Sequence, residues 1–315
     1  MATLPHPPAF GAHIFLWVER WRDDDAPRLL DRARGLGLSA LEIAVGDDMT
    51  IDAPALRRRA EEAGVEIVLS PGGAWPADCD ISADDPAHRE KGVAWHARWI
   101  RAAGECGAVA YTGAIYGHPG TVLRRRPPAD ELPRTAENLR RLAGEAARAG
   151  LVLALEPMSR FRTHLVNTPE QAMRLIGMAD HPALRVLFDT YHMMTEVRDF
   201  AAAARTLAPR LWGLHASESD RGVPGGGLVP WDALFRALAG AGMPPYVILE
   251  CYNTALGNFA LRRGLFRDLC PDGDDFVRHG LEFLRRHITG AGRQKSGSSP
   301  TSGGRKRLLR KLKRQ

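Results

Sequence analysis

The stretch LRVLFDTYHMM, residues 184–194, is a short and mostly apolar run that ends in polar side chains. Asp189 is the first polar residue after the run, and His192 follows three positions later. Apolar runs of this length, bounded by turn residues, are typical of strands buried on both faces of a parallel sheet. A carboxylate and an imidazole at the end of such a strand indicate chemistry at its carboxyl end.

The same pattern recurs along the chain, with helical stretches between the apolar runs. Residues 53–64 and 135–150 are rich in Ala, Leu, Arg and Glu and end in Gly, which is a helix stop signal. Another helix is predicted from Thr168, as its N-cap, with Pro169 in the first turn. The eight runs predicted as strands are 12–17, 40–45, 65–70, 108–114, 151–157, 184–191, 211–217 and 246–252.

Eight strand–helix units in this length predict an α/β fold of the (β/α)8 TIM barrel type. An open, doubly wound sheet is the alternative, and it would usually carry a Gly-rich phosphate turn after its first strand. LWVERW, residues 16–21, contains no such turn. No linker precedes residue 289, so we predict one barrel domain over 1–289 and a disordered basic tail over 290–315.

The composition is that of a soluble globular protein, with 44% hydrophobic and 25% charged residues among 315. We expect a cytoplasmic protein, because no apolar run reaches a membrane span and the first residues lack the features of a secretory signal. Residues 293–315 hold nine Lys or Arg and no acid, and subtracting these nine from the net charge of +6 leaves −3 for the rest. The tail could contact anionic surfaces, whereas nucleic acid is not expected to bind the barrel.

Four successive predicted strands end with a strong metal ligand. The four are Glu156, Asp189, His215 and Glu250. In a TIM barrel the carboxyl ends of the strands meet on one rim, so these side chains are expected to converge. Any single acid could instead cap the next helix, but four ligands in succession favour a shared site. Three carboxylates and one imidazole suit Mn²⁺, Mg²⁺ or Co²⁺ better than a thiolate-type zinc site.

Several motifs around these ligands resemble the ketose 3-epimerases, the D-tagatose/D-psicose 3-epimerase group of the xylose-isomerase-like barrels. The ligands are 33, 26 and 35 residues apart, as in that family. The resemblance covers roughly residues 10–288. The matching motifs are LEP with Glu156, DTYHM with Asp189 and His192, HASESDRGVPGGGLVPW with His215 and Arg221, LECYN with Glu250, and DISADDPAHREKG at 80–92.

The resemblance implies a sugar epimerase with one divalent metal ion, most often Mn²⁺ or Co²⁺, bound by the four ligands. Glu156 and Glu250 would remove and return the C3 proton of a ketose on opposite faces of a metal-bound cis-enediolate. His192 and Arg221 would hold the substrate at O1 and O2. Relatives are often dimers or tetramers, so a homo-oligomer is expected.

One position departs from the family pattern. Arg162 stands six residues after the first ligand, where the family commonly has a carboxylate that contacts the sugar near O1. A guanidinium cannot accept a hydrogen bond and carries the opposite charge. We therefore expect Arg162 either to face solvent or to contact a substrate whose C1 end is acidic or otherwise modified. Three aromatic side chains near strand ends, Trp17, Tyr116 and Trp231, are weaker candidates for the pocket wall.

Other functions are open on the same barrel. An aldose–ketose isomerase of the hydroxypyruvate type or an inosose-type dehydratase would use a similar site. A DNA-repair endonuclease of the AP-endonuclease type would need a cluster of about three zinc ions and more histidines than the spare His13, His118 and His164. A non-catalytic sugar-binding protein would not need all four ligands.

Overall fold

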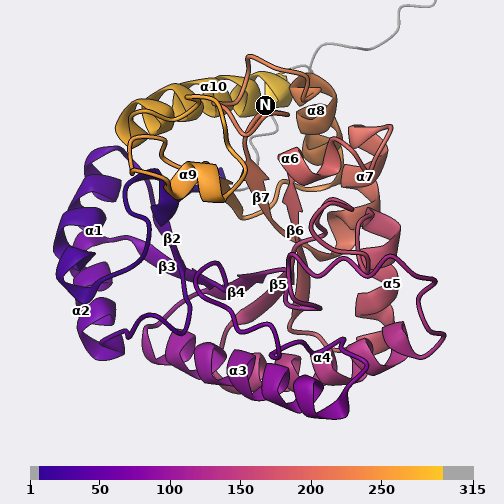
Figure 1. The fold of residues 1–315 in the computed structure, drawn as a ribbon. Helices are drawn as coiled ribbons and strands as arrows, with labels where there is room; N and C mark the ends of the chain where they lie inside the picture. Colours follow the sequence, from indigo (N-terminus) through magenta and orange to yellow (C-terminus); the bar gives the residue numbers. More distant parts are fainter. Residues whose placement is uncertain (1–6, 294–315) are drawn as a thin grey trace, which may run out of the picture.

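The computed structural model describes residues 7–293, and their side chains up to residue 288. Eight parallel strands close into a barrel, in which each strand pairs with the next and β8 pairs with β1 (Figure 1). The predicted TIM barrel is confirmed, and closure of the barrel excludes the open sheet. The strands are β1 Ala9–His13, β2 Ala40–Ala44, β3 Glu66–Ser70, β4 Ala110–Gly113, β5 Val152–Leu155, β6 Leu184–Asp189, β7 Leu211–Ala216 and β8 Tyr246–Leu249.

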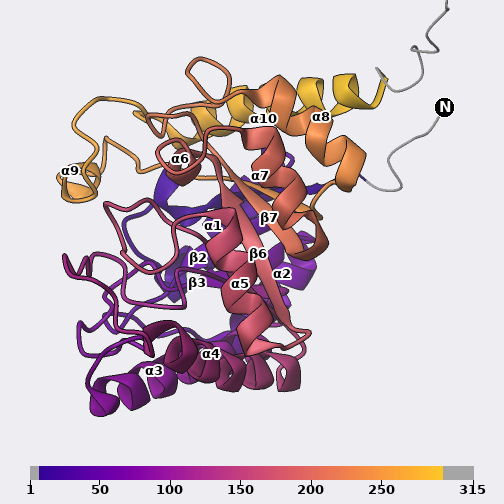
Figure 2. The ribbon, with the colours of Figure 1, turned by 90° about the vertical axis from the view of Figure 1, so that its right-hand side faces the viewer.

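The longer helices form a ring around the strands (Figure 1). The short helices α6 and α9 lie at one end of the barrel together with long loops (Figure 2). The helices are α1 Ala26–Gly35, α2 Ala53–Ala63, α3 Pro86–Glu105, α4 Glu131–Arg148, α5 Pro169–Ala179, α6 Thr190–Met193, α7 Phe200–Leu207, α8 Trp231–Ala241, α9 Phe259–Arg262 and α10 Gly273–Arg293.

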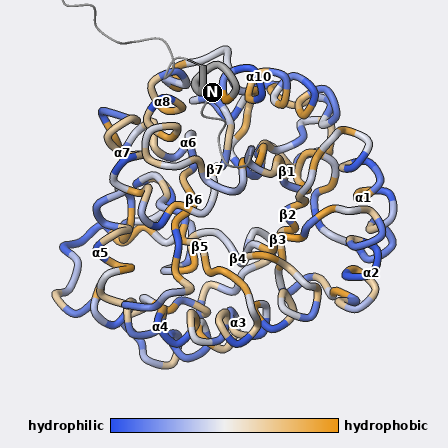
Figure 3. The backbone as a smooth tube through the Cα atoms, turned by 180° about the vertical axis from the view of Figure 1, so that it is seen from behind, coloured by the Kyte–Doolittle hydropathy of each residue, from blue (hydrophilic) through white to orange (hydrophobic). Residues whose placement is uncertain are grey.

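Side-chain alternation along β6 shows how the strands divide their residues between two regions. Val186 and Phe188 belong to the large apolar core. Leu187, on the other side of the strand, joins a separate small cluster contributed by the strands. Asp189 lies on the same side as Leu187, because alternate residues of a strand share a face. Figure 3 shows several strands as hydrophobic and the outer surfaces of the helices as largely hydrophilic.

The predicted elements match the structure closely except at the first strand. The run 12–17 overlaps β1 only at Ala12 and His13, since the chain turns after His13 into a 3-10 helix, Ile14–Leu16. The imidazole of His13 accepts a hydrogen bond from the backbone N–H of Phe15 and so stabilises this turn. The predicted N-cap of α5 is confirmed, because Thr168 and Gln171 form a reciprocal capping box.

The last described helix, α10, extends to Arg293. Of the predicted tail, 290–315, residues 294–315 lie outside the described residues, so the domain boundary at residue 289 stays a prediction. Within the part of the chain that the structure describes, no helix has the length and apolar character needed to cross a membrane.

Candidate active site

The structure brings the four predicted metal ligands together at the carboxyl ends of consecutive strands. Asp189 is the last residue of β6 and His215 lies in β7, while Glu156 and Glu250 directly follow β5 and β8. All four side chains are buried, and each offers a ligand atom within 4.8 Å of those of the others. The convergence predicted from the barrel geometry is therefore present.

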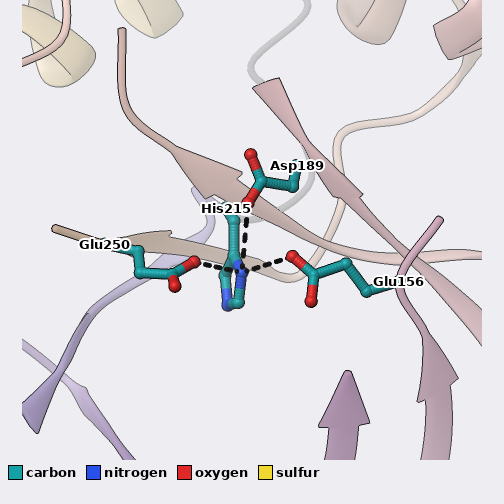
Figure 4. A group of neighbouring side chains, drawn as sticks. All are labelled: Glu156, Asp189, His215 and Glu250. Carbon is teal, nitrogen blue, oxygen red and sulfur yellow. Dashed lines mark hydrogen bonds and ion pairs between the residues drawn. The ribbon is translucent and has the colours of Figure 1, made fainter. Parts of the chain in front are cut away.

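The three carboxylates surround one nitrogen of His215 (Figure 4). Its Nδ1 lies 2.8 Å from Oε2 of Glu250, 3.1 Å from Oε1 of Glu156 and 3.9 Å from Oδ2 of Asp189. A single ring nitrogen carries at most one proton, so it cannot satisfy three carboxylates at once. Oε2 of Glu250 is buried and makes no hydrogen bond of normal geometry. This arrangement fits a site built around a cation.

The protonation states of the cluster reflect the crowding of like charges. Burial is the main reason that the pKa of Glu156 is raised to about 8, and the carboxylates of Asp189 and Glu250 act in the same direction, against the lowering effect of His215. Burial by itself would lower the pKa of His215, but the carboxylates of Glu42, Glu250 and Glu156 raise it well above its usual value. The surrounding carboxylates thus favour a positive charge at this position.

These residues could hold one divalent metal ion. The donor set, three carboxylates and one imidazole, offers mostly hard oxygen ligands, as Mn²⁺, Mg²⁺ and Co²⁺ prefer. Asp189 also has a structural role, since its Oδ1 accepts hydrogen bonds from the backbone N–H groups of Tyr191 and His192 and caps α6. Its other oxygen, Oδ2, faces the cluster.

The sequence analysis missed a fourth acid at this site, Glu42 in β2. Its Oε2 lies 2.7 Å from Nε2 of His215, and its Oε1 accepts a 2.6 Å hydrogen bond from the hydroxyl of Thr112. A carboxylate that accepts a hydrogen bond from Nε2–H leaves Nδ1 free to bind a metal ion and fixes the orientation of the ring. The available signal was an acid within the apolar run 40–45, where only the third position is polar.

The predicted substrate residues His192 and Arg221 both line the cavity beside this cluster. Burial lowers the pKa of His192 to about 4, so its ring is neutral near pH 7, and its Nδ1 has no hydrogen-bond partner. Arg221 is buried, and its guanidinium pairs with Asp189 at 2.6 Å and with Glu250 at 3.3 Å. Arg162 also lines the cavity, from an exposed position in the loop after β5.

The conformation of the loop between β7 and α8 depends on Glu218, a loop residue whose side chain is buried. Its carboxylate accepts hydrogen bonds from the backbone of Gly225 and Val229 and from the indole N–H of Trp231. The same loop carries Arg221 with a φ of 73°, a left-handed conformation that is uncommon for a residue with a side chain. The loop therefore holds Arg221 in a conformation that the rest of the fold must stabilise.

The aromatic side chains of the cavity are other than those considered from the sequence. The cavity has a volume of about 240 Å³, and its aromatic lining is Phe15, Trp75, Tyr191 and Tyr252. Tyr116 is instead fully buried, with its hydroxyl 3.0 Å from the backbone carbonyls of Glu156 and Val166. Trp17 and Trp231 bind Asp274 and Glu218 through their indole N–H groups.

The spare histidines do not extend the cluster into a site for several metal ions. His164 lies 3.1 Å from Glu131, away from the four ligands, and His118 lies 2.9 Å from the backbone carbonyl of Trp75. Over the described residues, the four ligands are the one group arranged to hold a metal ion. This does not favour the three-zinc endonuclease.

Comparison with known proteins agrees with the resemblance seen in the motifs. The chain is similar to an L-ribulose 3-epimerase of Mesorhizobium japonicum, with 27% identity over 276 residues that cover 87% of this chain and 92% of the relative. A ketose 3-epimerase of Arthrobacter globiformis is 27% identical over 281 residues, covering 89% of this chain and 96% of the relative. The prediction of an isomerase-class enzyme agrees with these names.

A solved structure of an L-ribulose 3-epimerase superposes with a TM-score of 0.87 at 27% identity, covering 95% of this chain and all of that one. The family model described as xylose isomerase-like TIM barrel matches residues 30–287. This match spans most of the barrel and all four ligands. The chain therefore belongs to the xylose isomerase-like TIM barrel family.

Proposed function

We propose that this chain is a divalent-metal-dependent ketose 3-epimerase that uses Glu156 and Glu250 as its two proton-transferring groups. The observation that carries the proposal is the position of these two carboxylates. They approach the centre of the cluster from opposite sides (Figure 4), within a cavity that reaches the cluster. Inversion at a carbon next to a carbonyl requires a base on one face and an acid on the other.

A bound divalent cation would polarise the C2 carbonyl of a ketose and so acidify the hydrogen on C3. Side chains of the protein would then transfer the protons. One glutamate removes the C3 proton, and the other returns a proton to the opposite face of the flattened carbon. Arg221 holds the carboxylate of Glu250 in place through its ion pair. For the reverse reaction, the two glutamates exchange roles.

His192 and Arg221 are proposed to bind the substrate beside the reacting carbons. The unpartnered Nδ1 of His192 and the unpartnered Nε of Arg221 are buried polar atoms beside the cavity, and both could bond to sugar oxygens. A guanidinium next to the C2 oxygen would stabilise negative charge that develops there. Arg162 is proposed to contact the C1 end, and Arg162→Glu should change which ketoses are accepted.

The test is a panel of ketoses assayed in D₂O after chelation and reloading with Mn²⁺, Co²⁺ or Mg²⁺. We expect deuterium at C3 and formation of the C3 epimer, only after a cation has been restored. Glu250→Gln should reduce the rate by about 10²–10⁴-fold, the range for loss of a general acid or base. Deuterium at C1 would indicate the aldose–ketose isomerase, and loss of water would indicate the dehydratase. Equal rates with and without a cation would contradict the proposal.

Two coarser expectations accompany this function. The absence of a membrane-spanning helix among the described residues is compatible with a cytoplasmic enzyme, and the resemblance to ketose 3-epimerases implies a dimer or tetramer. Sedimentation of the purified chain would measure its oligomeric state directly.

A further inference from the structure

Two arginines on the wall of the cavity have no role in the metal-ligand cluster. Arg162 lies in the loop after β5, and Arg263 directly follows α9 in the segment after β8. Among the described residues that line the cavity, the acids Glu42, Glu156 and Glu250 all belong to the site at the strand ends. The part of the cavity formed by the loops therefore presents two guanidinium groups and no carboxylate.

The arginines next to these two positions are neutralised by acids. The pairs are Arg160 with Glu196, Arg262 with Glu19, and Arg267 with Asp220. By contrast, neither Arg162 nor Arg263 forms an ion pair with any acid of the described part of the chain. Arg162 and Arg263, which line the cavity, thus carry unpaired charges, whereas Arg160, Arg262 and Arg267 close by are paired.

Arg263 is held in place without using up its capacity to bind an anion. Its Nη2 donates a 2.6 Å hydrogen bond to the carbonyl of Gly72, and its guanidinium carbon lies 4.5 Å from the ring centre of Phe15. The rings of Tyr252 and Phe259 lie 5.5 Å away. Because a guanidinium has five N–H donors in one plane, several remain for a ligand after one is used. Stacking on aromatic rings orients the group in advance.

From this arrangement we infer that the substrate is a ketose with an anionic group, a carboxylate or a phosphate, on a terminal carbon. The inference rests on the proposed function, in which the strand-end cluster binds the reacting carbons. The guanidinium groups of Arg162 and Arg263 then face the ends of the sugar chain. Guanidinium binds carboxylate and phosphate alike through paired hydrogen bonds. A neutral ketose would leave both positive charges without a partner.

The test compares D-fructose with its 1-phosphate, its 6-phosphate and the 6-carboxylate, D-fructuronate, using the Mn²⁺-loaded protein. We expect kcat/KM for at least one anionic sugar to exceed that for fructose by about tenfold or more. Arg162→Gln or Arg263→Gln should lower this anionic-to-neutral ratio by about 10- to 100-fold, the scale of one charged hydrogen bond. The matched variants Arg160→Gln and Arg262→Gln should keep the ratio. Comparison of the two phosphates identifies which arginine holds the anion.

Direct binding keeps this inference separate from the proposed function. Thermal unfolding is measured for each protein with fructose, with each phosphate and with fructuronate. Protection by an anionic sugar that depends on Arg162 or Arg263, without exchange at C3, would support the anion site and reject the epimerase. Epimerisation with equal kcat/KM for fructose and for the anionic sugars would support the proposed epimerase function and overturn the anion site. Arginine variants that affect all sugars equally would overturn the anion site in the same way.

Discussion

Glu42 is a residue whose role depends on distant parts of the chain. It is fully buried in β2, between the hydroxyl of Thr112 and Nε2 of His215, which is 173 positions away. Its carboxylate can accept a hydrogen bond from Nε2–H and so keep the Nδ1 lone pair available for a metal ion. In this way a residue that need not touch the metal ion can determine how well it is bound.

Glu42→Gln should weaken Mn²⁺ binding by about 10- to 100-fold, since the amide keeps the shape of the side chain but removes its charge. The measurement is competition for Mn²⁺ against a fluorescent chelator, with the melting temperature recorded to show that the variant is folded. Glu61→Gln, at an exposed position on α2, is the control. A folded Glu42→Gln variant with unchanged Mn²⁺ affinity would show that Glu42 serves packing alone.

His96 in α3 is a buried histidine outside the site. Its Nδ1 lies 3.0 Å from the hydroxyl of Tyr111, its ring packs edge-on against Trp75 and Trp95, and its Nε2 has no partner. Burial lowers its pKa to about 3, and the neighbouring His118 adds to the lowering. The folded protein therefore holds this ring neutral at pH values where the unfolded chain would protonate it.

Since the unfolded pKa is about 6.5, the unfolded state binds more protons than the folded state between pH 6.5 and pH 3. Above pH 6.5 this histidine does not lower the free energy of unfolding. Below pH 6.5 the free energy of unfolding falls with pH, by up to about 1.4 kcal/mol per pH unit for this one group. The free energy of unfolding, measured with urea between pH 7 and pH 5, should depend less steeply on pH in His96→Gln than in the unchanged protein. The difference should correspond to the uptake of roughly one proton on unfolding. His88→Gln, at a partly exposed position of the same helix, is the matched control. An unchanged slope in His96→Gln would refute this account.

Among the elements, the β7–α8 loop connects packing with Arg221, a proposed substrate-binding residue. Glu218 holds the loop through hydrogen bonds from Gly225, Val229 and Trp231, and the loop in turn holds Arg221 with its left-handed backbone. From this backbone conformation the side chain of Arg221 reaches Asp189 and Glu250. Loss of the hydrogen bonds to Glu218 should therefore displace Arg221 and weaken substrate binding at the proposed site.

Glu218→Gln cannot accept all three hydrogen bonds, because one oxygen is replaced by a donor. We expect KM for the ketose to rise by about tenfold, equivalent to about 1.4 kcal/mol, while Mn²⁺ affinity changes by less than about threefold. Steady-state kinetics and metal titration measure the two effects separately. The control is Asp232→Asn in the exposed first turn of α8. If Mn²⁺ affinity falls as much as KM rises, the loop supports the metal ligands as well.

For the whole molecule, the cluster of acids at the barrel mouth links stability to metal binding. Four buried carboxylates, counting Glu42, face one imidazole and one guanidinium. Buried like charges are unfavourable without a compensating cation. Since the ligands come from four strands that are far apart in the sequence, a metal ion would be bound by the folded chain and only poorly by the unfolded chain.

Removal of metal by chelation should lower the melting temperature, and Mn²⁺ at 100 times its Kd should restore about 2.7 kcal/mol. For a chain of 315 residues that corresponds to a shift of roughly 4 °C. Scanning calorimetry with and without Mn²⁺ measures the shift. Asp189→Asn can still cap α6 through its side-chain oxygen but loses a charged ligand, so its shift should be much smaller. Equal shifts in the two proteins would place the bound ion elsewhere.

The sequence by itself determined the barrel and the four-ligand cluster. Both follow from local patterns: eight apolar runs alternating with helical stretches, and a ligand at the end of each of the last four runs. A closed parallel barrel brings those ends to one rim, whatever the details of packing. The same local logic identified Thr168 as the N-cap of α5, because a capping box involves only neighbouring residues.

Only the tertiary structure decided what depends on contacts between distant segments. The end of β1 at His13, the burial of Arg221 and the position of Glu42 under His215 are examples. The unpaired state of Arg162 and Arg263, beside neighbours that are paired, is another. A sequence pattern shows which side chains a strand or loop presents, but the partner of each is selected by three-dimensional packing. Charge pairing and burial are properties of that packing, and they determine what the site can bind.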